Sequence, residues 1–129
     1  MELSKVLLDA SAYIAYISQE PGCDVVSEII GKSCINTVTY TEIISFYTKK
    51  GLSDDLLKEL CQYVEIINVN ENICYAAGHM IKTSRDYGLS LGDRLCLATA
   101  QYFNLTVYTA DKIWLRVADE LKINIVTIR

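Results

Sequence analysis

Proline, histidine and tryptophan are scarce in this chain, with one of each in 129 residues. The single proline, together with a hydrophobic content of 51%, excludes a disordered or fibrous chain and predicts a sizeable core. Because His79 is the only histidine, the sequence lacks a histidine cluster for a metal and an evident base for a nucleophilic triad. No apolar stretch reaches the roughly 18 residues that cross a bilayer, so we expect no membrane association.

The five cysteines lack the CxxC spacing typical of a zinc site. They fall mostly among apolar neighbours, at Cys23, Cys34, Cys61, Cys74 and Cys96. We expect reduced thiols that pack like small apolar side chains in a cytoplasmic protein, with intracellular disulfides as the alternative. Asp9 interrupts the apolar N-terminal run and no small-residue cleavage site follows it, so we expect a buried strand and helix there, not a signal peptide.

The formal net charge of −4 differs from the basic balance that nucleic-acid-binding domains usually carry. Four of the 16 acids stand apart because each falls at the start of a predicted helix: Asp9, Glu42, Asp93 and Asp111. Without these four, the 12 remaining acids balance the 12 Lys and Arg. The excess of negative charge therefore has a local origin, and bound metal ions would offset it.

Short β-prone segments alternate with amphipathic helical segments along the chain. The predicted strands span residues 5–8, 33–38, 64–67, 106–108 and 123–128. The predicted helices span residues 12–17, 23–30, 39–50, 53–63, 70–86, 94–103 and 113–121. Thr39 and Glu42 have the spacing of a capping box at the start of the third helix. Strands separated by helices predict an α/β fold, a three-layer αβα sandwich with a central, mainly parallel sheet, in a single domain of residues 1–129.

Three of the four acids, Asp9, Glu42 and Asp111, come just after predicted strands, and Asp93 opens a helix. Because the carboxyl ends of parallel strands share one edge of a sheet, acids spread along the chain can meet there. Each acid alone has a simpler explanation, since carboxylates commonly cap helices, but Ser, Thr or Asn would cap as well. Clustered carboxylates repel one another without a cation, and their oxygens suit Mg²⁺ or Mn²⁺, so the set predicts a metal site.

Four short motifs carry a resemblance that spans almost the whole chain. The motifs are Leu8-Asp9-Ala10-Ser11-Ala12, Val38-Thr39-Tyr40-Thr41-Glu42, Leu89-Ser90-Leu91-Gly92-Asp93 and the segment from Leu105 to Asp111. In order and spacing they resemble the acidic motifs of the PIN-domain ribonucleases, especially the VapC-type toxins of VapBC toxin–antitoxin pairs. Each motif alone is weak, and the specificity comes from the set.

The resemblance implies a PIN-like fold and a metal-dependent endoribonuclease that hydrolyses RNA phosphodiester bonds. Its catalytic residues and the ligands of Mg²⁺ or Mn²⁺ would be Asp9, Glu42, Asp93 and Asp111. Ser11 and Thr109 would be accessory hydroxyl groups beside them. Leu115 stands where some relatives carry a further acid, which leaves the number of metal ions open. The resemblance also implies a homodimer and a small antitoxin protein that covers apolar grooves and reaches the acidic pocket with a basic side chain.

Basic residues close to the acids could bind the phosphates of an RNA substrate. Arg94 and Lys112 directly follow two of the acids and are the predicted substrate-binding residues. Arg116 also lies near the predicted edge, and for Lys49 and Lys50 an ordinary solvated face is the favoured alternative.

The predicted helix with Glu42 is apolar on more than one side. One stripe contains Tyr40, Ile43, Ile44 and Tyr47, and Phe46 lies well around the helix from it. A broad apolar surface favours contact with a partner, with simple core packing as the alternative.

Other functions fit parts of the pattern. A phosphoryl-accepting receiver domain also has a small parallel sheet and an acidic Mg²⁺ pocket, but it would need an acidic pair where this chain has only Asp9. A PIN domain that binds without cutting is a second alternative, since fold does not fix activity. A PIN nuclease that processes cellular RNA is a third, and a neighbouring antitoxin gene would distinguish a toxin from it.

Overall fold

A five-stranded, entirely parallel sheet forms the centre of the protein in the computed structural model, which describes residues 5–129 except the side chains of residues 84 and 85. The strand order is β3-β2-β1-β4-β5. The strands are β1 (Val6–Leu8), β2 (Ser33–Asn36), β3 (Glu65–Ile67), β4 (Thr106–Thr109) and β5 (Ile125–Thr127). The predicted parallel α/β sheet is thereby confirmed.

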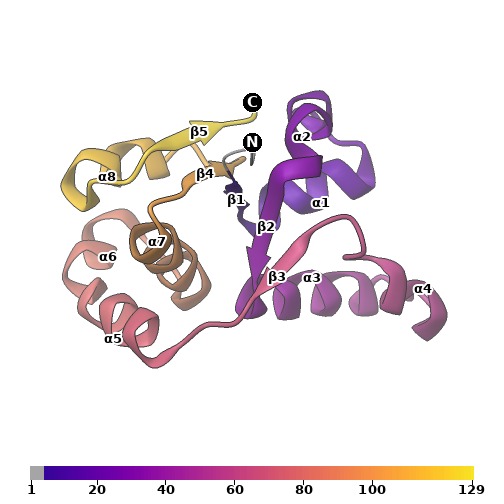
Figure 1. Ribbon diagram of the computed structural model, residues 1–129, viewed down its shortest axis with the longest axis horizontal. Coiled ribbons are helices and arrows are strands. Elements are labelled where there is room, and N and C mark those ends of the chain that lie inside the picture. The colour runs from indigo at the N-terminus through magenta and orange to yellow at the C-terminus, as the bar shows by residue number, and fades with distance from the viewer. Residues whose placement is uncertain (1–4) are drawn as a thin grey trace.

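Helices cover both faces of this sheet and make the three-layer αβα arrangement that the sequence predicts (Figure 1). One face carries α1 (Ala10–Ser18), α2 (Cys23–Ile29), the short 3-10 helix η1 (Ile30–Lys32), α3 (Thr37–Lys49) and α4 (Asp54–Glu59). The other face carries α5 (Glu71–His79), α6 (Ile81–Tyr87), α7 (Leu91–Phe103) and α8 (Trp114–Leu121). In the described part of the chain no helix is long and apolar enough to cross a membrane.

Side chains of the central strands alternate between two separate cores, as the two-residue period of a strand requires. Leu7 and Val107 are fully buried on the side of α5–α8. Leu8 and Ile35 are fully buried on the side of α1–α4. All three residues of β1 are buried, which is typical of a parallel strand covered on both faces.

The connections reverse direction between β1 and β4. From β1 the chain moves outward through β2 to β3, and it then crosses to the other side of β1 to form β4 and β5. The carboxyl ends of β1 and β4 lie next to each other, with Leu8 paired to Tyr108. Ligands of open α/β sheets bind at such a reversal, outside the carboxyl ends of the strands.

Several helix boundaries differ from the sequence-based prediction; the helix predicted over 53–63, for example, ends at Glu59. The predicted capping box of Thr39 and Glu42 is wrong, because α3 begins at Thr37 and its N-cap is Asn36. The predicted long helix over 70–86 is two helices, α5 and α6, and the interruption follows Gly78, a poor helix former. The helix predicted to begin at residue 94 begins at Leu91.

Candidate active site at the carboxyl edge of the sheet

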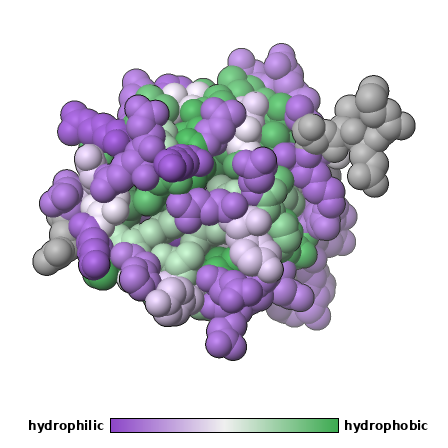
Figure 2. Space-filling view, turned by 60° about the vertical axis from the view of Figure 1, so that its left-hand side comes forward, coloured by the Kyte–Doolittle hydropathy of each residue, from purple (hydrophilic) through white to green (hydrophobic). Residues whose placement is uncertain are grey.

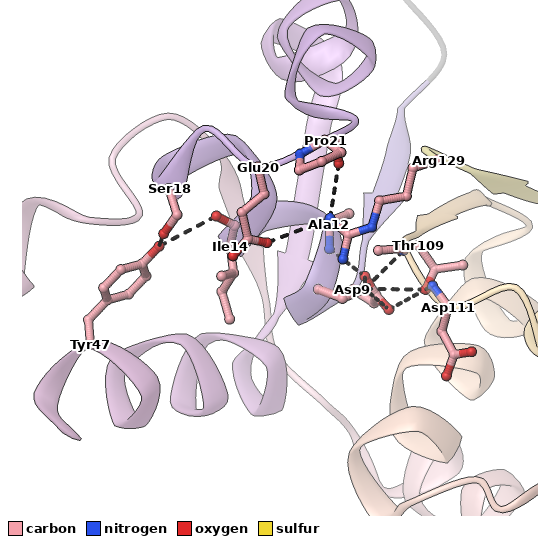
Figure 3. Close-up of polar contacts among 12 residues, drawn as sticks. Asp9, Ala12, Ile14, Ser18, Glu20, Pro21, Tyr47, Thr109, Asp111 and Arg129 are labelled. Carbon is pink, nitrogen blue, oxygen red and sulfur yellow. Dashed lines mark hydrogen bonds and ion pairs between the residues drawn. The ribbon is translucent and has the colours of Figure 1, made fainter. Parts of the chain in front are cut away.

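Asp9 follows β1 and is the most buried of the four acids, with 6% of its surface exposed. It is the N-cap of α1, and its Oδ1 accepts a hydrogen bond from the backbone N–H of Ala12 at 2.8 Å. The Ser11 hydroxyl donates to its carboxylate at 2.8 Å, and the Thr109 hydroxyl donates to Oδ2 at 2.5 Å. Asp9 therefore does cap a helix, but its carboxylate is also tied to the end of β4 (Figure 3).

The hydroxyl groups of Ser11 and Thr109 connect the ends of β1 and β4. Ser11 Oγ accepts from the backbone N–H of Ala110 at 2.9 Å, and Thr109 Oγ1 accepts from the backbone N–H of Asp111 at 3.0 Å. Each hydroxyl thus donates to Asp9 and accepts from the segment that leads to Asp111. This arrangement supports the accessory position predicted for both residues.

Glu42 lies on α3, beyond the first turn, and takes no part in capping that helix. Its carboxylate faces α7 at Gly92, where a Cβ atom would lie 2.6 Å from Glu42 Oε2. The simpler explanation for Glu42, a capping-box partner, is therefore excluded by the position of the helix start. What brings Glu42 to the other acids is the close approach of α3 to α7.

Asp93 combines a capping bond with a place at the acidic pocket. Ser90 is the N-cap of α7, and Ser90 and Asp93 form a reciprocal capping box in which the Ser90 backbone N–H donates to Asp93 Oδ2 at 2.9 Å. Asp93 is half-buried, and burial, followed by the charge of Asp111, raises its pKa. The hydrogen bonds from Ser90 act in the opposite direction, because they favour the ionised carboxylate.

Asp111 follows β4 and is exposed. Its Oδ1 accepts from the backbone N–H of Ile113 at 3.0 Å, which orders the turn into α8. Its carboxylate points away from Asp9, although both residues border the same pocket (Figure 3).

All four acids line one pocket of about 220 Å³ at the reversal point of the sheet. The pocket is lined also by Ala10, Ser11, Thr39, Gly92, Cys96 and Trp114. The sequence-based prediction that distant acids converge at this edge agrees with this geometry.

The electrostatics of the pocket reflect burial and the mutual repulsion of the carboxylates. Burial raises the pKa of Asp9 from its ordinary value of 3.8 to about 6, against the lowering effect of its hydrogen bonds from Thr109, Ala12 and Ser11. The charge of Asp93 raises it further. Burial also raises the pKa of Glu42, as do the charges of Asp93 and Asp9. The protein thus concentrates negative charge that a cation would offset.

Carboxylate oxygens are the ligands that Mg²⁺ and Mn²⁺ prefer, so the chemistry of the pocket fits a divalent cation. In this conformation the carboxylates stand apart: within the described residues, no three Asp, Glu, His or Cys side chains lie close enough to hold one ion. Joint ligation requires the acids to draw closer than they do here. Glu42 and Asp111, the two exposed members, have the most freedom to do so.

The predicted phosphate-binding residues do not line this pocket. Arg94 is directed to α5, where its Nη1 donates to the backbone carbonyl of Ala77 at 3.0 Å. Lys112 is exposed beside Asp111. Contact of Arg94 and Lys112 with a substrate remains a prediction. Leu115, at the position of a further acid in some relatives, is 49% exposed on α8.

His79 and four of the five cysteines lie outside the pocket, and Cys96 borders it. All five cysteines are free thiols, and Cys34, Cys61 and Cys96 are buried, as expected of small core residues. Cys74 is exposed. His79 contacts the Tyr75 hydroxyl through Nε2 at 3.1 Å on α5.

Two residues that line the pocket and one buried amide do not stand out in the sequence. The chain's one tryptophan, Trp114, borders the pocket with 1% exposure, and its indole Nε1 has no hydrogen-bond partner within the described residues. Gly92 was part of a recognised motif, but its contact with Glu42 depends on the packing of two helices. Asn36 precedes α3 and falls in the predicted strand 33–38, yet an Asn at the end of a strand and the start of a helix is itself an N-cap signal.

Comparison with known proteins agrees with the fold and with the motifs. The family model of the PIN domain matches residues 6–120. No curated protein sequence matches the chain.

Several solved structures share the fold. A chain of a toxin–antitoxin complex from Klebsiella pneumoniae is 21% identical, with a TM-score of 0.74 over 97% of this chain and 98% of that one. A chain of DNA-bound VapBC from Salmonella typhimurium is 16% identical, with a TM-score of 0.76 over 98% and 100%. A chain of VapBC-1 from nontypeable Haemophilus influenzae is 20% identical, with a TM-score of 0.69 over 95% and 97%. Because the family model covers most of the sequence and the four acidic motifs meet in one pocket, this chain belongs to the PIN domain family.

Proposed function

We propose that this protein is a metal-dependent endoribonuclease and the toxin of a toxin–antitoxin pair. The observation that carries the nuclease proposal is the shared pocket of Asp9, Glu42, Asp93 and Asp111, which come from four separate segments of the chain. The nucleases of the PIN family generally use divalent metal ions. The four carboxylates of the pocket supply oxygen ligands and concentrate negative charge, which supports Mg²⁺ or Mn²⁺ as the cofactor.

In the proposed reaction, the four acids would hold a divalent cation, which when bound would lower the pKa of a water molecule and offset negative charge on the phosphodiester. Asp9 would be the most constrained ligand, because its carboxylate accepts hydrogen bonds from Ala12, Ser11 and Thr109. Glu42 and Asp111, which are exposed, would be the ligands with the most room to move toward the cation. The reaction needs no covalent intermediate, which agrees with the placement of His79 and of the exposed Cys74 outside the pocket.

The decisive experiment is cleavage of labelled RNA by the purified protein, free of any antitoxin. Cleavage should require Mg²⁺ or Mn²⁺, stop with EDTA and fall by at least about 10²-fold in Asp9→Asn, which keeps the shape of the side chain but removes its charge. The matched control is Asp55→Asn, which removes an exposed carboxylate from the first turn of α4. If the folded protein cuts no RNA with either metal, or if Asp9→Asn cuts as well as Asp55→Asn, the nuclease proposal is wrong.

An apolar groove supports the proposal of an antitoxin partner. The groove has a volume of about 370 Å³ and lies between α1, α3 and α4, where it is lined by Ile17, Tyr47, Leu52, Leu56 and Tyr63 among others. Leu56 and Tyr63 are 52% and 51% exposed, although both are large and apolar. Of the apolar residues of α3, Ile43 and Tyr47 are buried in the core, whereas Phe46 is only partly buried. Core packing therefore uses one side of α3 and leaves part of its apolar surface available.

The test of the partner is co-expression with the product of a small neighbouring reading frame. We expect a stable complex that suppresses RNA cleavage and that Leu56→Asp weakens. Leu56→Met, which keeps an apolar side chain of similar volume at the same exposed position, is the control and should bind as the unchanged protein does. A nuclease with no neighbouring inhibitor would instead be an RNA-processing member of the family.

The proposed homodimer would use another surface. Figure 2, in which the α5–α8 side comes forward, shows apolar surface between the polar side chains. The exposed apolar residues of these helices include Tyr75, Ile81, Tyr102 and Phe103. Light scattering of the isolated protein at micromolar concentration should give the mass of two chains, and the mass of one chain would contradict the dimer.

A further inference from the structure

Asn36 joins two helices through a single buried side chain. The residue is fully buried at the end of β2. Its Oδ1 accepts from the backbone N–H of Thr39 at 2.7 Å, which caps α3. Its Nδ2 donates to the Thr99 hydroxyl at 3.0 Å and to the Leu95 backbone carbonyl at 3.3 Å, both on α7. One amide therefore fixes the start of α3 to the middle of α7.

Capping alone does not explain this side chain. An N-cap needs only an oxygen acceptor, and Ser, Thr or Asp supplies one as well as Asn does. The partners also settle the orientation of the amide, because the Thr39 N–H can only donate and the Leu95 carbonyl can only accept. The two hydrogen bonds to α7 are therefore a second role of this side chain. Among the common N-cap residues, only Asn has an amide that donates two hydrogen bonds while its oxygen caps the helix.

The two helices that Asn36 connects are those that carry Glu42 and Asp93. Their approach is close at the pocket itself, where no room remains for a side chain at Gly92 beside the Glu42 carboxylate. Repulsion between Glu42 and Asp93 raises the energy of this approach when both are ionised. A buried hydrogen-bonded connection between the same helices opposes that repulsion and keeps the two acids together before a cation binds.

We infer that Asn36 and Thr99 are positioning residues of the acidic pocket: their hydrogen bond holds α3 against α7 and so sets the distance between Glu42 and Asp93 for binding of a divalent cation. The inference rests on the proposed metal-dependent function. It assigns a role to two residues that do not line the pocket.

The experiment compares Thr99→Val with Thr99→Ser. Valine keeps the volume of threonine but lacks the hydroxyl, whereas serine keeps the hydroxyl and loses a methyl group. If Thr99 matters only as filling of the core, serine should be the more harmful change. If its hydroxyl positions α3, valine should be the more harmful change for metal binding.

Binding of Mn²⁺ to the substrate-free protein, measured from the electron paramagnetic resonance of the free ion, gives a readout other than activity. We expect Thr99→Val to weaken Mn²⁺ binding by at least about tenfold, as loss of an outer hydrogen-bond partner of a metal site commonly does, and Thr99→Ser to retain most of the affinity. Asn36→Ser, which can still cap α3 but cannot reach α7 with a donor, should resemble Thr99→Val and serves if that variant does not fold.

Ser33→Ala is the matched control for a general loss of stability. It removes another buried hydroxyl from the same strand, one that donates to the Ile29 carbonyl at 2.7 Å at the opposite edge of the sheet. Its Mn²⁺ affinity should equal that of the unchanged protein even if its melting temperature falls as far as that of Thr99→Val. Equal weakening by Ser33→Ala, or unchanged affinity in folded Thr99→Val and Asn36→Ser, would overturn the inference.

This experiment gives different results if only the positioning role is wrong and if the proposed function itself is wrong. If the unchanged protein binds Mn²⁺, Asp9→Asn abolishes binding and Thr99→Val does not alter it, only the positioning role is wrong. If the unchanged protein binds no Mn²⁺ at the pocket, the proposed function is wrong and the positioning role with it.

Discussion

Gly92 and Glu42 lie in contact across two helices: a Cβ atom at position 92 would be 2.6 Å from Glu42 Oε2 and 2.9 Å from its Cδ. Glycine is ordinarily unfavourable inside a helix, by about 0.5–1 kcal/mol relative to alanine. Its presence in the first turn of α7 is explained by the space that the Glu42 carboxylate needs. Gly92 thus lowers the stability of α7 but leaves room for the Glu42 carboxylate.

We therefore predict that Gly92→Ala displaces Glu42 and lowers the rate of RNA cleavage by about 10²-fold, the scale of effect expected from a misplacement of about 1 Å. Gly78→Ala is the control. Gly78 is also helical, on α5, and a Cβ atom there would meet nothing within 4 Å. That variant should keep its activity and unfold at a higher urea concentration. Equal activity of the two alanine variants would show that Glu42 tolerates the added methyl group.

The sequence predicts the parts of this site that depend on local patterns, and not the parts that depend on packing between segments distant in the sequence. The order of strands and helices follows from local patterns, and the meeting of Asp9 with Asp111 follows from parallel pairing of β1 with β4. The approach of Glu42 to Gly92 depends instead on how two helices pack, and no local pattern encodes it. The sequence therefore predicts which acids meet, but not the glycine and the amide that allow them to meet.

The start of α3 shows why a local pattern can mislead. Thr39 and Glu42 have capping-box spacing, but Asn36 is also a strong N-cap and lies at the end of β2. The tertiary bonds of Asn36 to α7 favour the earlier start. Because Asn36 is the N-cap, Thr39 and Glu42 both lie within α3, where they border the pocket.

The Thr109 hydroxyl should control the protonation of Asp9. It donates to Asp9 Oδ2 and accepts from the Asp111 backbone N–H, and it is fully buried. In Thr109→Val, loss of the bond that favours the ionised carboxylate should raise the pKa of Asp9 above about 6. The backbone N–H of Asp111 also loses its acceptor, so the free energy of unfolding should fall by about 0.5–1.5 kcal/mol.

Titration of the Asp9 carboxyl carbon by NMR in the metal-free protein measures this change directly. Thr41→Val is the control, because the Thr41 hydroxyl is exposed and bonds only within its own helix, to the Thr37 carbonyl. The role assigned to Thr109 is wrong if the pKa of Asp9 is the same in Thr109→Val and in Thr41→Val.

The raised pKa of Asp9 predicts how stability changes with pH in the metal-free protein. Between pH 3.8, its ordinary pKa, and about 6, its pKa in the folded chain, the folded state binds more protons than the unfolded state. Stability must therefore fall as pH rises through this range, by about 3 kcal/mol from Asp9. The raised pKa values of Glu42 and Asp93 act with the same sign.

Urea unfolding with EDTA should accordingly show a more stable protein at about pH 5 than at about pH 7.5. In Asp9→Asn the decrease should shrink, whereas in Asp55→Asn it should persist. Addition of Mg²⁺ or Mn²⁺ at the higher pH should restore stability, because an ion that binds only the folded state stabilises it. A stability that rises from pH 5 to pH 7.5 without metal would contradict the raised pKa of Asp9.

Trp114 provides an internal reporter of the acidic pocket. As the one tryptophan of the chain it gives a single indole N–H signal in the NMR spectrum of ¹⁵N-labelled protein. The indole borders the pocket, is 1% exposed and has no hydrogen-bond partner within the described residues. An unpaired buried donor is unfavourable by about 1–3 kcal/mol. Because the indole N–H borders the pocket, a shift of the acids around a cation should change the surroundings of this N–H.

We predict that Mg²⁺ shifts this indole signal and that paramagnetic Mn²⁺ broadens it at substoichiometric concentration. The amide signal of Gly31, in η1 at the opposite edge of the sheet, should be the less affected and serves as the control within the same spectrum. Both effects should disappear in Asp9→Asn if the ion binds among the four acids. If Mn²⁺ broadens Gly31 as strongly as Trp114, or if the indole responds equally in Asp9→Asn, the cation binds elsewhere and the acidic pocket is not its site.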